Sequence, residues 1–230
     1  MNVRTTIVFS SLALIYLATL PLTPYVAQFL PKALPIVVLA VFAYTKLSAM
    51  PRYMVLTALL FSLAGDVSLA LPFADSFITG LACFFVAHLT YAMCFALLHR
   101  RLQETPGDHI ISRKPKWLIS IIMVSFAVMM AVHILPASKA LFYPVVAYIS
   151  VITLMGLTAV WLAQTKLIVT GALLFVISDS ILAQSVFKTP LPLSTFWVMT
   201  TYYGAQYCLT MGLVDGFLRK ENRQEEIGQT

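Results

Sequence analysis

Charged residues are scarce in this chain. Of its 230 residues, 15 are lysine or arginine and nine are aspartate or glutamate, so that 10% are charged while 60% are hydrophobic. Soluble domains carry roughly 25% charged residues. The apolar residues also occur in long blocks, which excludes a soluble domain with a single core and indicates a domain that lies in a bilayer.

Cysteine is rare too, with only Cys83, Cys94 and Cys208, each inside an apolar block. Their odd number and the lack of a CxxC pair argue against a disulfide framework and against a thiolate metal site. The sequence has no GxSxG elbow and no P-loop. These absences argue against a serine hydrolase of that type and against a P-loop nucleotide-binding enzyme.

Histidines are equally few, and their positions do not suit a metal site. His99 and His109 fall in a polar loop and His133 near the end of an apolar block, so three histidine ligands are not available at one depth. We therefore expect no metal and no cofactor. An intramembrane aspartyl protease is also disfavoured, because its YD, GxGD and PAL patterns are missing around Asp66 and Asp179.

Eight apolar blocks are close to the roughly 20 residues that a membrane-spanning helix needs. They cover residues 6–22, 33–49, 54–71, 77–98, 117–135, 140–163, 167–187 and 195–217. The second is the weakest, being short and broken by Pro35. The first lacks a clear A-x-A cleavage site, so we expect a retained helix rather than a signal peptide. The sequence predicts an all-α polytopic bundle of eight transmembrane helices in one domain, 1–217, with a short cytoplasmic tail, 218–230.

The basic residues predict the orientation of this bundle. With a cytoplasmic N-terminus, only Lys32, Lys139 and Lys188 lie on the outer side. The inner side collects Arg4, Lys46, Arg52, Arg100, Arg101, Arg113, Lys114, Lys116, Lys166, Arg219, Lys220 and Arg223. Because cytoplasmic loops are rich in lysine and arginine, we predict cytoplasmic N- and C-termini and a bacterial inner membrane. The same rule accounts for the net charge of +6, so no nucleic-acid partner is expected.

Two short segments resemble one another. The chain reads GDVSLA around Asp66 and SDSILA around Asp179, in the third and seventh predicted spans. These spans are four helices apart and therefore run in the same direction. A 4+4 duplication would explain the similarity, and chance similarity between short apolar segments is the alternative.

Asp66 and Asp179 are the strongest candidates for function. An ionised carboxylate near the bilayer centre costs at least about 2.5–3.5 kcal/mol, and such residues usually face the bundle interior. Each lies 12 residues after its predicted span begins, about 18 Å along the helix axis. We therefore expect both carboxylates in one layer, with the small neighbours Gly65 and Ser178 allowing close helix approach. The alternative is that they only tie helices together by hydrogen bonds.

Other polar side chains are expected in the same layer. His88 and Tyr91 are three residues apart in the fourth span, and Tyr203 and Gln206 are three apart in the eighth, so each pair shares a helix face. Both tyrosines lie too deep for the interfacial belt. Lys32, in LPKALPI at the outer entry of the second span, is either an interfacial lysine or an anion-binding residue at a pocket mouth.

Five segments follow one another along the chain: KALPI with Lys32, GDVSLA with Asp66, FVAHLTY with His88 and Tyr91, ALLFVISDSILA with Asp179, and YYGAQY with Tyr203 and Gln206. In this order they resemble the YhhN family, which includes the lysoplasmalogenases. The resemblance covers nearly the whole chain. The resemblance implies hydrolysis of the vinyl-ether bond of a lysoplasmalogen, a lysophospholipid substrate, to a fatty aldehyde and a glycerophospho-base.

The residues present fit that chemistry. Vinyl-ether hydrolysis begins with protonation of carbon by an acid and gives an oxocarbenium ion that water captures, so one aspartate would donate the proton. The second would stabilise the cation or activate the water, as paired carboxylates do in glycosidases. Lys32 would hold the substrate phosphate, and His88, Tyr91, Tyr203 and Gln206 would line the substrate site.

Two other functions stay open from the sequence. A proton-coupled transporter would use the same aspartates as a proton relay, and helices interrupted by glycine or proline near them would favour it. Gly65 alone offers such a break. A structural membrane protein would use the polar layer only to join helices. The sequence does not indicate an oligomeric state.

Overall fold

The computed structural model describes residues 3–25, 27–103, 113–163 and 165–228, and these ranges consist of helices and short connections, with no strand. The α-helices are α1 (Val3–Thr19), α2 (Phe29–Lys46), α3 (Ala49–Ala70), α4 (Ser76–Gln103), α5 (Arg113–Ser138), α6 (Phe142–Thr158), α7 (Lys166–Phe187) and α8 (Ser194–Gly228). Short helices η1 (Leu20–Leu22), η2 (Lys139–Leu141) and η3 (Ala159–Ala163) extend or join them. The all-α prediction is confirmed for the described residues.

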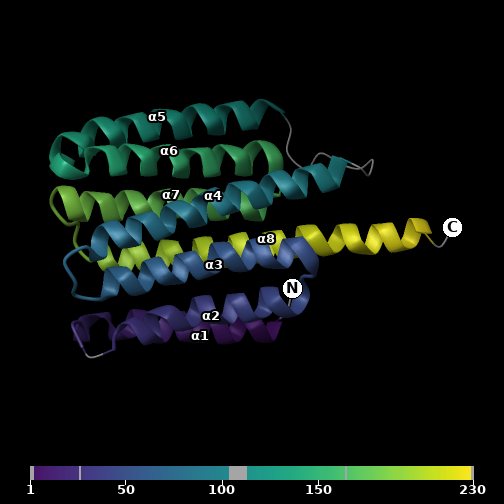
Figure 1. Ribbon diagram of the computed structural model, residues 1–230, viewed down its shortest axis with the longest axis horizontal. Helices are drawn as coiled ribbons and strands as arrows, with labels where there is room; N and C mark the ends of the chain where they lie inside the picture. The colour runs from purple at the N-terminus through teal and green to yellow at the C-terminus, as the bar shows by residue number, and fades with distance from the viewer. Residues whose placement is uncertain (1–2, 26, 104–112, 164, 229–230) are drawn as a thin grey trace.

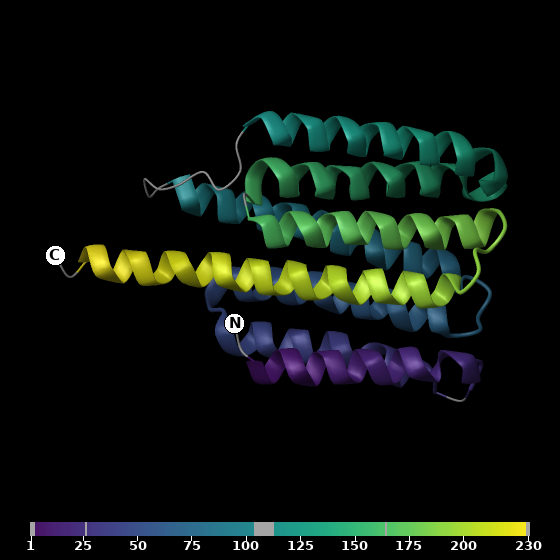
Figure 2. The same ribbon diagram turned by 180° about the vertical axis from the view of Figure 1, so that it is seen from behind.

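The helices lie side by side with their long axes roughly aligned (Figures 1 and 2). α5 and α6 form one side of the bundle and α1 and α2 the opposite side, with α3, α4, α7 and α8 between them (Figure 1). Both chain ends lie at the same end of the bundle. The connections α3–α4, α5–α6 and α7–α8 lie at the other end, which we call the distal end.

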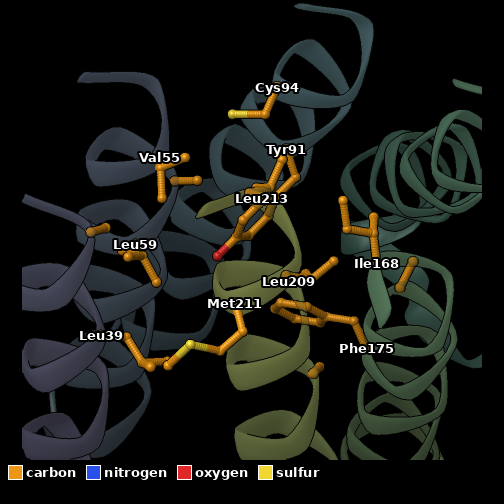
Figure 3. Packing of buried hydrophobic residues seen from close by; sticks show 14 of the residues in the cluster. Leu39, Val55, Leu59, Tyr91, Cys94, Ile168, Phe175, Leu209, Met211 and Leu213 are labelled. Carbon is orange, nitrogen blue, oxygen red and sulfur yellow. The ribbon is translucent and has the colours of Figure 1, made fainter. Parts of the chain in front are cut away.

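The core is built around α8. Side chains from α2, α3, α4 and α7 converge on Leu209, Met211 and Leu213 of α8 (Figure 3). α7 approaches α8 closely because Gly171 has no side chain: a Cβ there would lie 2.9 Å from the backbone nitrogen of Leu209. Small residues at such crossings let membrane helices pack backbone to backbone.

The outer surface of the bundle exposes many large apolar side chains, as expected for a surface in contact with lipid. Leu14 of α1 and Val132 of α5 are 65% and 72% exposed, and many other large apolar side chains also face outward. Soluble monomers rarely expose apolar patches of this extent. Within the described residues, six helical stretches are long and apolar enough to cross a membrane, one of them, Pro115–Ala163, holding both α5 and α6. Eight separate crossings and the 4+4 duplication stay predictions.

Several boundaries differ from the sequence prediction. α2 begins at Phe29 instead of 33 and continues through Pro35, its seventh residue, although a proline inside a helix removes one backbone hydrogen bond. α3 begins at Ala49 instead of 54, because its first turn contains Pro51 and Arg52 and fell outside the apolar block. Residues 218–228 of the predicted tail continue α8 as helix. Part of the predicted polar loop, 104–112, and the last two residues of the tail lie outside the described residues.

The orientation of the bundle gives a testable expectation. The end that carries both termini also carries Arg4, Lys46, Arg52 and Lys166, so the positive-inside rule predicts that this end faces the cytoplasm. A reporter that works only in the cytoplasm should be active when fused after Thr230. Activity of a periplasm-only reporter at that position would contradict the predicted orientation.

Candidate active site

Asp66 is held by an ion pair and a tyrosine at the meeting point of α2, α3 and α8. Lys32 Nζ lies 3.3 Å from Asp66 Oδ1 and donates a hydrogen bond of 3.2 Å to the backbone oxygen of Asp66. The Tyr202 hydroxyl donates to Asp66 Oδ2 at 2.6 Å, and the Tyr203 hydroxyl donates to the backbone oxygen of Lys32 at 2.8 Å. Both carboxylate oxygens of Asp66 are therefore occupied by protein groups.

The burial of Lys32 explains this pairing. Only 9% of the residue is exposed, so its ammonium group does not reach outward as an interfacial lysine would. A buried ammonium is stable only when it is paired and hydrogen-bonded. Asp66, 3% exposed, supplies both a carboxylate oxygen and a backbone oxygen.

Asp179 is held differently, by His88 of α4 and Tyr148 of α6. The Tyr148 hydroxyl donates to Asp179 Oδ2 at 2.5 Å, and His88 Nε2 lies 3.2 Å from the same oxygen and 3.0 Å from the tyrosine hydroxyl. His88 is fully buried, and its Nδ1 has no hydrogen-bond partner among the described residues. Within the same ranges no side chain donates to Asp179 Oδ1. One oxygen of Asp179 is thus fixed and the other is open.

Asp179 lines an apolar pocket enclosed by side chains of α3 to α7. The pocket has a cavity volume of about 80 Å³, within about 760 Å³ of empty space that includes its open part. The polar lining residues are Asp179, Tyr148, Ser180 and Thr153. From Asp179 the pocket runs towards the distal end, where its lining includes Phe187, the last residue of α7. Asp66 does not line this pocket.

Three aromatic rings link the surroundings of the two carboxylates. Phe84, Phe175 and Tyr202 make mutual edge contacts, with ring centroids 5.5 to 6.2 Å apart. Phe175 also packs against His88 at 4.5 Å. These rings connect the Asp66 cluster (Lys32, Asp66, Tyr202 and Tyr203) with the Asp179 cluster (His88, Tyr148 and Asp179).

Tyr91 and Gln206 bond to each other instead of to an aspartate. The Tyr91 hydroxyl donates to Gln206 Oε1 at 2.6 Å, which ties α4 to α8, and both residues are fully buried. Gln206 Nε2 has no hydrogen-bond partner among the described residues. This pair belongs to the same buried polar region but does not line the pocket.

The structure thus divides the predicted site residues into three groups. It joins Lys32 and Tyr203 to Asp66, joins His88 to Asp179, and leaves Tyr91 with Gln206. The roles predicted for these residues stay predictions.

Two further partners were missed by the sequence reasoning. Tyr148 lies in a helix without any acidic residue, so no motif pointed to it. Tyr202 stands next to the predicted Tyr203, and its four-residue spacing to Gln206 would have placed it on the same helix face.

The equal spacing of the two aspartates from their predicted span starts is not kept in the helices. Asp66 lies 17 residues after Ala49, the first residue of α3, and Asp179 lies 13 residues after Lys166, the first residue of α7, because α3 begins earlier than its apolar block. That both carboxylates lie in one layer stays a prediction. Within the described residues, no three histidine, cysteine or acidic side chains are grouped closely enough to hold a metal ion.

The fold and the buried polar clusters define a class: an all-α integral membrane protein with ionisable side chains inside its bundle. Within that class the chain belongs to the YhhN family, whose pattern matches residues 27–213. This confirms the resemblance seen in the sequence. The matched range runs from just before α2 into α8 and contains both aspartate clusters.

Relatives with assigned names support the same family. The chain is 34% identical over 184 residues to human lysoplasmalogenase TMEM86B, covering 79% of this chain and 73% of that protein. It is 32% identical to porcine lysoplasmalogenase TMEM86B over 68% of this chain and 61% of that one. With bovine lysoplasmalogenase TMEM86A it shares 29% over 70% and 65%. The matched part is less than two thirds of the porcine and bovine proteins. No solved structure matches the chain.

Proposed function

We propose that this protein hydrolyses the vinyl-ether bond of a lysoplasmalogen-like lysophospholipid, with Asp179 as the acid. The observation that carries the proposal is the open Oδ1 of Asp179, in a carboxyl group that lines an apolar pocket. An apolar pocket with few polar groups suits a long hydrocarbon chain with one reactive bond. The lysoplasmalogenase names of the relatives support the substrate class.

The reaction begins with proton transfer to carbon. Protonated Asp179 gives its proton to the vinyl carbon farther from the ether oxygen, and the C=C electron pair forms the new C–H bond. The ether oxygen then shares the positive charge of the oxocarbenium ion, and Asp179 is left as the carboxylate. Tyr148 and His88 hold Oδ2 throughout, so the acid keeps its orientation.

Water completes the reaction. Water adds to the oxocarbenium carbon and loses a proton to the Asp179 carboxylate, which restores the acid. The resulting hemiacetal then breaks its bond to the glyceryl oxygen, which takes up the hydroxyl proton. One water is consumed for each fatty aldehyde and glycerophospho-base released.

Asp66 supports the site from outside the pocket in this proposal. Its carboxylate fixes Lys32 and Tyr202, and Tyr202 packs against the pocket-lining ring of Phe84. The buried Tyr91–Gln206 pair holds α4 against α8, so that His88 stays in place on α4. Lys32 directs its ammonium to two oxygens of Asp66, so binding of the substrate phosphate by Lys32, as predicted from the sequence, would use its remaining N–H donor.

A proton-coupled transporter remains the alternative for the same aspartates. Transporters of that kind place ion sites where helices are interrupted. α3 and α7 are each one continuous helix through their aspartate, an observation that supports the hydrolase over this alternative.

Mass spectrometry of lipids incubated with the purified protein in detergent tests the proposal. We expect release of a long-chain aldehyde from a lysoplasmalogen, and no release from the matching lysophospholipid with a saturated ether. Chelator should leave the rate unchanged. Turnover that requires sealed vesicles and collapses with a protonophore would support the transporter.

Tyr148→Phe tests the orientation of the acid. The variant keeps the ring but loses the hydroxyl that donates to Asp179 Oδ2, so we expect kcat to fall about 10-fold with little change in KM, by analogy with the loss of a charge-assisted hydrogen bond. Tyr143→Phe on the exposed side of the same helix should retain normal kinetics. Normal turnover in Tyr148→Phe would show that the hydroxyl does not orient the acid.

A further inference from the structure

The ring of Phe84 lies where the two aspartate clusters meet, and it lines the pocket that Asp179 also lines. On one side it contacts Gly65, the residue before Asp66. A Cβ at position 65 would lie 2.7 Å from two edge atoms of the ring, Cδ2 and Cε2. Only glycine therefore lets the ring occupy this place against α3.

Two other rings hold Phe84 from the bundle interior. Phe175 and Tyr202 meet it edge-on, with centroids at 6.2 and 5.9 Å and interplanar angles of 76° and 88°. Tyr202 is in turn anchored by its hydroxyl on Asp66, and Phe175 packs on His88. Both aspartate clusters thus fix the position of one ring at the pocket wall.

We infer that Phe84 is a catalytic residue whose π-electrons stabilise the oxocarbenium ion, an inference that rests on the proposed hydrolysis. The reaction places a positive charge in an apolar pocket. Asp66, the expected second carboxylate, has both oxygens occupied and does not line this pocket. An aromatic face attracts a cation by its quadrupole, and the attraction is strongest when water is excluded.

The same arrangement gives Asp66 a definite role as a positioning residue. It anchors the Tyr202 hydroxyl, and the Tyr202 ring supports Phe84. Gly65 and Asp66 then both act on the position of Phe84. Gly65 leaves room for the Phe84 ring, and Asp66 holds Tyr202, whose ring packs against Phe84.

Phenylalanine analogues with one, two and three ring fluorines, incorporated at position 84, test the inference. Each fluorine withdraws electron density from the π face while hardly changing the size of the ring. We expect kcat to fall stepwise, by about 10-fold for the trifluorinated ring, with KM within about twofold, since a desolvated cation–π contact contributes on this scale. Melting temperatures of the variants should match the wild type.

Position 95 provides the matched control. Phe95 lies about three turns later on α4, is fully buried and does not line the pocket. The same fluorinated series there should leave kcat unchanged. Tyr202→Phe, which loses the hydroxyl on Asp66, should lower kcat without raising KM.

The outcomes separate the inference from the function beneath it. If the wild type releases no aldehyde, the proposed hydrolysis fails. If the wild type is active but its rate is the same with every fluorinated ring at position 84, hydrolysis stands and the role of Phe84 is wrong. Equal trends at positions 84 and 95 would also overturn the inference, because they would reflect the packing of α4.

Discussion

Asp179→Asn should reduce kcat by about 1,000-fold or more and leave the protein folded. The asparagine has nearly the same shape, but it cannot give a proton to carbon, and general acids contribute about 10²–10⁴-fold to rate. Tyr148 and His88 both contact Asp179 through Oδ2, and the amide oxygen of the asparagine can take the place of that atom. KM should therefore change little. Aldehyde release and a melting curve measure both parts of the expectation.

Ser180→Ala is the matched control for this variant. Ser180 is the next residue of α7, lines the same pocket and donates its hydroxyl to the backbone oxygen of Val176 within the helix. Its loss should leave turnover close to normal. Near-normal turnover in Asp179→Asn would mean that another group supplies the proton.

Lys32→Met should destabilise the protein by about 3–5 kcal/mol, the usual effect of removing one partner from a buried ion pair. Asp66 would then be a buried carboxylate with only Tyr202 to bond it. The double variant Lys32→Met/Asp66→Leu should recover most of this loss, because no charge stays buried. Its turnover should remain low, since Tyr202 has lost its anchor. Thermal or denaturant unfolding in detergent gives the stabilities.

Lys46→Met is the control, because Lys46 is the exposed last residue of the same helix. Surface substitutions of this kind usually change stability by less than about 0.5 kcal/mol. A Lys32→Met protein of normal stability in which KM alone rises would contradict the structural pairing. That result would place Lys32 on the substrate phosphate instead, because lost uniform binding raises KM.

The long apolar blocks were enough to predict the helices. The limits of the helices followed from composition, except where a helix extends beyond its apolar block, as at Phe29, at Ala49 and at the end of α8. Asp66 and Asp179 could also be singled out from the sequence, because a carboxylate in a membrane-spanning segment is costly and rare and usually has a function. Partners of these carboxylates were harder to predict, since a helix that is apolar all round does not indicate which face meets which neighbour.

Tyr148 and Lys32 illustrate that difficulty. Tyr148 reaches Asp179 only because α6 packs beside α4 and α7, a tertiary fact that no local pattern contains. Lys32 has the sequence context of an interfacial lysine, but α2 begins early enough to bury it beside Asp66. The sequence predicted both carboxylates in one layer of polar groups. In the structure Asp179 lines an apolar pocket, whereas Asp66 forms a buried ion pair with Lys32 outside that pocket.

Hydrolysis of a lysoplasmalogen in D₂O tests the central claim most directly. If an acid protonates the vinyl carbon, the released aldehyde must carry one deuterium at carbon 2, next to the carbonyl carbon. Immediate reduction with borohydride to the alcohol prevents later exchange, and mass spectrometry then counts the deuterium. We predict one deuterium per aldehyde with the wild type and background levels of product with Asp179→Asn. Aldehyde released without deuterium at carbon 2 would contradict protonation of the vinyl ether, and with it the role of Asp179 as the acid.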